Sequence, residues 1–226
     1  MKLTQYLSAS ALSAGILVIL MMPSSALATT VYSISGITQD GFEVGGSVDV
    51  ILAESWSETT SFSGVDITAI LGDYLGSGTI TAYLTTQIGA GATSAEQVAK
   101  ANITPATSDE TDTLFTGLSL GPGTYYLVLS SPNEATWWGS TTSSTIRAAG
   151  VTAGMPLFAA TGSGSPDNTY APGSTFVSDT GVAEFFTVSS NPTPEPSTFY
   201  LLATGLGAAV WLRRRKTNSC VTKRKI

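Results

Sequence analysis

Apolar and polar residues alternate with a period of two in five short stretches of the central chain, and this periodicity limits the possible folds most. Successive side chains of a strand point to opposite faces, so each stretch predicts a β-strand with one buried face. Glycine and proline, which favour turns, separate the stretches. Several short strands of this kind are typical of an antiparallel β-sandwich, and we expect an all-β, jelly-roll-like one. The five stretches are residues 47–52, 65–71, 79–85, 124–129 and 182–188.

One segment in this region predicts a hairpin. Residues 114–129 read LFTGLSLGPGTYYLVL, in which Gly121-Pro122-Gly123 separates two apolar runs. Glycine and proline together favour a tight turn, so we expect the two runs to pair with each other.

Another segment predicts one short surface helix. Residues 94–101 read SAEQVAKA. Ser94 can cap a helix, and Glu96 falls in its first turn, where a negative charge is favourable.

The N-terminal segment has the three parts of a secretory signal peptide. Lys2 provides a positive start, residues 11–22 are apolar, and Ala26 and Ala28 are small residues at the two positions that signal peptidase reads. We expect residues 1–28 to be removed, which leaves Thr29 as the new N-terminus. An uncleaved membrane helix is the alternative, although the apolar run is shorter than the ~20 residues of a full span.

The C-terminal segment has three ordered parts. Residues 191–198 (NPTPEPST) form a proline-rich stalk, and residues 199–212 (FYLLATGLGAAVWL) are apolar. A helix of that length would be ~21 Å long, short against a ~30 Å hydrocarbon core. Residues 213–226 are a basic tail, which the positive-inside rule places in the cytoplasm, so the central domain lies on the other side. The tail begins with the retention cluster Arg213, Arg214, Arg215 and Lys216.

Pro194-Glu195-Pro196, the short apolar segment and the arginine-rich cluster together resemble the PEP-CTERM sorting signal. The resemblance implies recognition by an exosortase, cleavage near the motif, and passage through the inner membrane to the cell surface or extracellular matrix. It also implies an origin in Gram-negative bacteria, which commonly make exopolysaccharide. Residues 217–226 extend further than is usual for such tails. The alternative is an ordinary single-pass anchor, which predicts the same topology without processing.

The central region also resembles, more loosely, the sandwich domains called choice-of-anchor domains, which are often attached to such tails. The resemblance covers residues 66–126, ending in the Gly-Thr-Tyr-Tyr part of the strand at 124–129. It implies a fold and no particular activity.

Charge is distributed very unevenly. Between residues 29 and 190 the chain has two bases, Lys100 and Arg147, against fifteen acids, a net charge of −13. A domain this acidic is repelled by nucleic acid, so we expect no nucleic-acid partner.

The residue types that most often carry chemistry are scarce. The chain has no histidine, and its single cysteine is Cys220. The central domain therefore lacks the residues for nucleophilic catalysis based on histidine or cysteine. We also expect no cofactor and no metal. Residues 109–112 (DETD) offer oxygen ligands for Ca²⁺ but lack the glycine and spacing of an EF-hand loop, and a solvated turn explains them more simply. A pair of carboxylates acting on a glycosidic bond is the remaining enzymatic reading.

Two adjacent tryptophans, Trp137 and Trp138, are the candidate ligand site. Neighbouring residues of a strand face opposite sides, so one ring could pack in the core while the other stacks on a sugar. Packing of both rings in the core or at an edge is the alternative.

We therefore expect a noncatalytic cell-surface or biofilm-matrix protein that contacts exopolysaccharide or other surface proteins. The alternative is a carbohydrate-binding module with a tryptophan stacking site, and a glycoside hydrolase is third.

Overall fold

The computed structural model describes residues 28–36, 40–46, 50–72, 78–105, 109–160, 175–179, 181–191 and residue 205. Nearly all of the expected signal peptide and transmembrane segment lies outside these residues. A search of the described residues found no helix that is both long enough and apolar enough to cross a membrane. The central domain is a compact unit that spans Ala28–Pro192.

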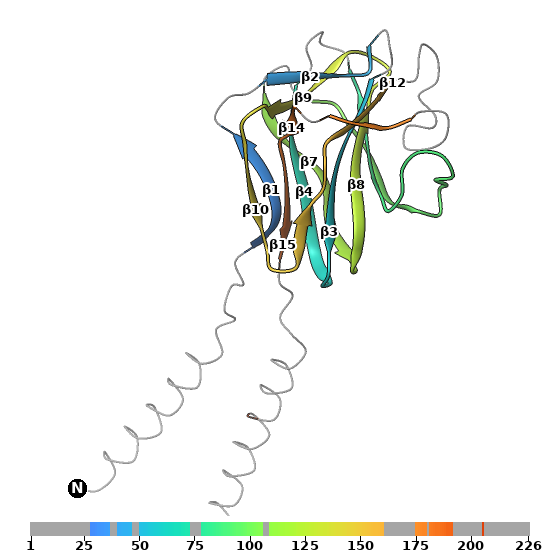
Figure 1. The fold of residues 1–226 in the computed structure, drawn as a ribbon. Coiled ribbons are helices and arrows are strands. Elements are labelled where there is room, and N and C mark those ends of the chain that lie inside the picture. The colour runs from blue at the N-terminus through green and yellow to red at the C-terminus, as the bar shows by residue number, and fades with distance from the viewer. Residues whose placement is uncertain are drawn as a thin grey trace, which may run out of the picture. The chain divides into compact units, whose positions relative to one another are not determined.

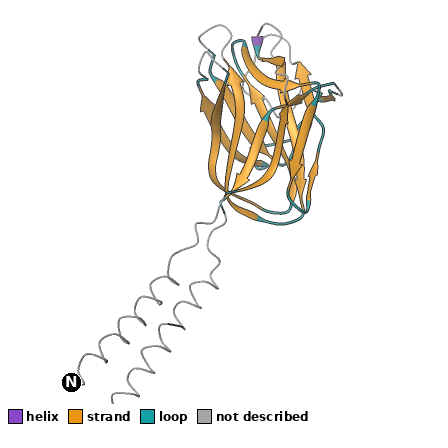
Figure 2. Cartoon of the chain, turned by 90° about the vertical axis from the view of Figure 1, so that its left-hand side faces the viewer, coloured by secondary structure: helices purple, strands orange, loops and turns teal. Residues whose placement is uncertain are grey.

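Two antiparallel sheets pack face to face in this unit, and the longer strands of both run along its length (Figures 1 and 2). The prediction of an all-β sandwich is confirmed. Sheet A consists, within the described residues, of β1 (Thr29–Gly36), β2 (Asp40–Val44), β4 (Phe62–Gly72), β7 (Glu110–Leu120), β9 (Ala135–Ser140), β10 (Ser143–Arg147), β14 (Ala183–Glu184) and β15 (Phe186–Ser190). Sheet B consists, within the same residues, of β3 (Val50–Glu58), β5 (Ile80–Thr85), β6 (Gln97–Ile103), β8 (Gly123–Ser130), β11 (Val151–Ala153), β12 (Leu157–Ala160) and β13 (Val177–Ser178).

Strand β4 pairs with two different strands along one of its edges. Val65 to Ala69 pair with β15, and Leu71 and Gly72 pair with β9. Phe185 lies where the two neighbours meet, because its N–H donates to Trp138 O at 2.7 Å and its carbonyl accepts from Ile70 N at 3.3 Å. The expected strand at residues 182–188 is therefore interrupted at Phe185, between β14 and β15.

An aromatic cluster occupies the space between the sheets. The ring centroids of Tyr32 and Phe186 are 5.3 Å apart, and those of Trp56 and Tyr125 are 5.8 Å apart. Each large apolar side chain buried here stabilises the fold by about 1.5–3 kcal/mol. Packing of this kind holds together a domain whose described residues contain no cysteine.

The expected surface helix at residues 94–101 is wrong. Residues 94 and 95 form a turn, and Gln97–Ile103 form strand β6, antiparallel to β5. The edge of β5 offers a full set of backbone partners, and pairing with it outweighs a weak local preference for helix. Alternate residues of β6 point to solvent, and Ala99, Ala101 and Ile103 pack against the core.

The expected hairpin at residues 114–129 is also wrong. Strand β7 pairs with β4 in sheet A, whereas β8 pairs with β3 and β5 in sheet B. Gly121 and Pro122 therefore connect the two sheets. Leu120 and Leu127, one from each strand, are both buried in the same core, which they enter from opposite sheets.

Candidate functional site

The two adjacent tryptophans of β9 have separate environments. Trp137 points into the core, where it is fully buried and its Nε1 donates to the carbonyl of Phe185 at 3.0 Å. Trp138 points to the opposite face of sheet A and is only partly buried. Of the two, only Trp138 lies where a ligand could reach it.

The indole of Trp138 lies against two glycines on the neighbouring strands. A Cβ placed on Gly41 would lie 3.5 Å from Cη2 and Cζ3 of the ring, and one placed on Gly72 would lie 2.9 Å from Nε1. Gly41 is on β2 and Gly72 is on β4, on either side of β9. The absence of side chains at both positions lets the ring lie down across the sheet.

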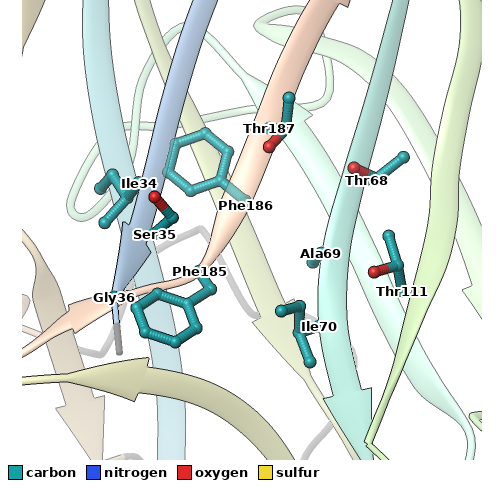
Figure 3. Close-up of a pocket in the computed structure, with 10 residues that line it drawn as sticks. All are labelled: Ile34, Ser35, Gly36, Thr68, Ala69, Ile70, Thr111, Phe185, Phe186 and Thr187. Atoms are coloured by element: carbon teal, nitrogen blue, oxygen red, sulfur yellow. The ribbon is translucent and has the colours of Figure 1, made fainter. Parts of the chain in front are cut away.

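A recess of about 140 Å³ lies on the outer face of sheet A (Figure 3). Hydroxyl-bearing side chains from four strands surround it, and Ile70 supplies apolar surface. Phe185 also lines the recess but is only 3% exposed. The ten labelled residues that line it are all uncharged. The name outer-face recess is used below for the space lined by Ser35, Thr68, Thr111, Thr187, Ile70 and Phe185.

Trp138 and the outer-face recess adjoin each other. Phe185 N donates to Trp138 O, and Ile70 N donates to Phe185 O. Leu71 and Trp137 are register partners that point inward, so Ile70 and Trp138 beside them point outward on the same face. Sequence reasoning singled out Trp138 but missed the recess, because its residues come from segments far apart in the chain.

Two glutamates, one from each sheet, meet inside the sandwich. Glu54 and Glu184 are each only 1% exposed, and their carboxyl groups lie close enough to interact. The backbone N–H of Glu184 also donates to Oε1 of Glu54 at 2.9 Å. Burial, together with the adjacent carboxyl of Glu184, raises the pKa of Glu54 well above its usual range, and burial raises the pKa of Glu184.

This glutamate pair is enclosed, so a polysaccharide chain cannot reach it as glycosidic cleavage would require. Glu58 and Asp112 are also partly or fully buried, and one oxygen of each has no hydrogen-bond partner among the residues that the structure describes. Within the described residues, no group of three or more acidic, histidine or cysteine side chains is arranged to hold a metal ion. Asp112 belongs to strand β7 and not to a loop.

The two ends of the sandwich lie side by side. Ala28, the last residue of the expected signal peptide, is exposed, and the next residue, Thr29, is the register partner of Ser190. Asn191 makes the last described contacts, with Gly64 O at 3.0 Å and Asp66 Oδ2 at 3.2 Å. The sequence-predicted sorting motif, the basic cluster and Ala26 lie outside the described residues.

A family comparison covers the segment that follows. Residues 192–216 match the PEP-CTERM protein-sorting motif. The tail is a PEP-CTERM sorting signal. The match begins next to Asn191 and ends at Lys216, so it includes the Pro-Glu-Pro motif, the apolar segment and the basic cluster.

The predicted resemblance of the tail is therefore confirmed. A PEP-CTERM tail marks a secreted protein that is anchored transiently in the membrane and processed by an exosortase. A search of the curated proteins and a search of the solved structures each found no match. The resemblance of residues 66–126 to choice-of-anchor domains stays a prediction.

Proposed function

We propose that the protein is a noncatalytic component of the cell surface or biofilm matrix, where its sandwich contacts exopolysaccharide or other surface proteins. One observation carries the proposal: the sorting motif starts at residue 192, directly after the last strand of the sandwich ends at Ser190. The whole sandwich therefore precedes the signal and travels with the exported part of the chain.

The charge of the tail supports the direction of export. Arg213 to Lys216 follow the apolar segment, and clustered bases of this kind stay on the cytoplasmic side. Signal peptidase would act at Ala28 and the exosortase near Pro194 to Pro196, both on the outer side of the inner membrane. The released sandwich would carry an excess of acids, which favours solubility and disfavours polyanionic partners.

The noncatalytic part of the proposal rests on chemistry. The sandwich segment has no histidine and no cysteine. Within the described residues, Glu54 and Glu184 meet in the interior, where a substrate has no access. A glycoside hydrolase would need two carboxyls beside an open cleft, so it is the weakest of the three functions considered.

Sorting is tested by Glu195→Ala in the native host, with mass spectrometry of the C-terminus of the mature protein. We expect wild type to lose the residues from Phe199 onward and the variant to keep Ile226 and accumulate in the inner membrane. The reason is that the central charge of the Pro-Glu-Pro motif is removed while the membrane-spanning and basic parts are intact.

Glu134→Ala, the same substitution in the sandwich, serves as the control and should be processed like wild type. If wild-type protein at the surface still ends at Ile226, the tail is a permanent anchor and the sorting part of the proposal fails.

A further inference from the structure

We propose that Trp138 and the outer-face recess together form a binding site for pyranose units of a neutral polysaccharide. This inference builds on the proposed surface function and names the class of ligand and the residues that would contact it.

The first support is the way in which Trp138 is held. Its ring rests on the backbone at Gly41 and Gly72, where there are no side chains to lift it away from the sheet. A ring laid along a sheet presents its opposite face outward, and the apolar face of a pyranose stacks on such a surface. A β-sheet with a ring in this position is a rigid support for stacking.

The second support is the contrast between Trp138 and its neighbour. The indole N–H of Trp137 is satisfied by the carbonyl of Phe185. The indole N–H of Trp138 is shielded from water and has no hydrogen-bond partner in the part of the chain that the structure describes. Trp137 therefore serves the core, whereas Trp138 is only partly buried, and the face of its ring, not its shielded N–H, is the part that a ligand could contact.

The third support is the recess beside the ring. Ser35, Thr68, Thr111 and Thr187 bring hydroxyls, which both donate and accept hydrogen bonds, around the partly exposed side chain of Ile70. Sugars carry the same combination of hydroxyl groups and apolar C–H faces. A mostly apolar pocket with a few convergent polar groups is the usual form of a small-ligand site.

Charge selects between neutral and acidic polysaccharides. The residues that line the recess are uncharged, and the region from 29 to 190 has a net charge of −13. No described base lies at the recess to pair with a uronate or a sulfate. A neutral glycan is therefore the favoured occupant, because an anionic one would be repelled without a compensating contact.

The position of the site suits an exported protein. Strand β1 begins at Thr29, beside the residue that leads into the stalk, and ends at Gly36, which lines the recess. At ~3.3 Å per residue the two ends of this strand are about 23 Å apart. The recess thus lies toward the end of the sandwich away from its chain termini, where a polymer has access.

The test measures binding of the full-length chain, purified in mild detergent, to immobilised neutral glucans, galactomannan and xylan, with alginate as the anionic comparison. We expect saturable binding to at least one neutral polymer and none to alginate. Trp138→Ala should weaken the binding at least tenfold, and Trp138→Phe should retain part of it. Phe158→Ala, which removes a surface aromatic from sheet B, should bind like wild type.

A second set of variants keeps the proposal testable if Trp138→Ala does not fold. Thr68→Val and Thr111→Val remove hydroxyls from the recess without touching the ring, and we expect each to weaken binding severalfold at unchanged thermal stability. Failure of wild type to bind any neutral polymer overturns the proposal, as does wild-type affinity in all the recess and Trp138 variants, or a preference for alginate.

These outcomes are separate from those of the sorting experiment. A protein that is processed normally but binds no polymer contradicts the glycan site alone. A protein that binds glycan but keeps its tail contradicts the sorting proposal alone.

Discussion

The glutamate pair inside the sandwich shows how tertiary structure changes the chemistry of single residues. Glu54 lies on β3 between Leu52 and Trp56, which point the same way into the core. Because side chains of a strand alternate between its two faces, the positions of Leu52 and Trp56 predict that Glu54 also points inward. Its partner Glu184 lies 130 positions away, and no local pattern connects the two.

We predict that the free energy of unfolding falls as pH rises from 5 to 8, by about 1–3 kcal/mol, because of this pair. Glu54 and Glu184 have folded-state pKa values raised above their unfolded values. Such groups contribute stability that is complete below the unfolded pKa and is lost as pH rises through the folded pKa. Urea unfolding at several pH values measures the slope.

Glu54→Gln should flatten that slope and stabilise the domain at pH 8. Its amide oxygen can accept from Glu184 N, and its NH₂ can donate to the Glu184 carboxylate at every pH. The control is Glu96→Gln, since the pKa of Glu96 is lowered by hydrogen bonds from Thr93 and this exposed residue gives no slope above pH 5. An unchanged slope in Glu54→Gln would show that the pair does not cause the pH dependence.

At the scale of the elements, four of the five expected strands overlap single observed ones, and the fifth spans β14 and β15. The alternation of apolar and polar residues in these stretches indicates a strand with one buried face, and this pattern is local to each stretch. Pairing partners are not local: β7 and β8 are consecutive and joined by a turn sequence, yet they belong to different sheets. The same limit applies to β6, where the edge of β5 converted an expected helix into a strand.

Engineered disulfides test which strands β7 and β8 pair with. The domain of residues 29–191 has no cysteine of its own, so the new cysteines would have no competing partner there. Ser57→Cys with Thr124→Cys should crosslink on oxidation, because the two hydroxyl oxygens are 2.8 Å apart on β3 and β8. Ser63→Cys with Ser119→Cys should also crosslink, because these residues are register partners on β4 and β7. Each bond should add about 2–4 kcal/mol to the free energy of unfolding.

The comparison pair is Ser119→Cys with Thr124→Cys, which a hairpin with Gly121-Pro122 as its two-residue turn would place opposite each other. We expect no intramolecular disulfide from this pair in non-reducing gels. Its rapid formation in native protein would restore the hairpin and contradict the two-sheet connection.

At the scale of the whole domain, the two ends of the sandwich lie close together. Thr29 pairs with Ser190, so the chain enters and leaves the domain at adjacent strands. Neighbouring termini let a domain be tethered, released or reconnected without disturbance of its core.

A circular permutant tests that arrangement. A short Gly-Ser linker from Asn191 to Thr29, with new termini between Ala90 and Gly91, should fold with a free energy of unfolding within about 2 kcal/mol of the parent. Ala90 and Gly91 are both exposed in a turn. Circular dichroism and urea unfolding measure the result.

The control permutant opens between Ser33 and Ile34, inside β1, and should not fold, because that strand pairs with β10 on one side and β15 on the other. Equal stability of the two permutants would mean that β1 is not an integral strand.

The sequence by itself determined the sorting signal and the all-β class. Both depend on order along the chain: the succession of Pro-Glu-Pro, an apolar run and a basic cluster in one case, and alternation with period two in the other. The sorting signal is defined by the order of three adjacent parts of the chain, so local order is the property that matters there.

Only the tertiary structure decided which strands pair, which tryptophan faces outward and which acids meet in the core. It brought Ser35, Thr111 and Thr187 from three separate strands to one recess beside Trp138. The sequence does not specify strand partners because strands pair through backbone N–H and C=O groups, which are nearly the same at every residue. The choice of partner therefore depends on which arrangement buries the apolar faces of all strands together.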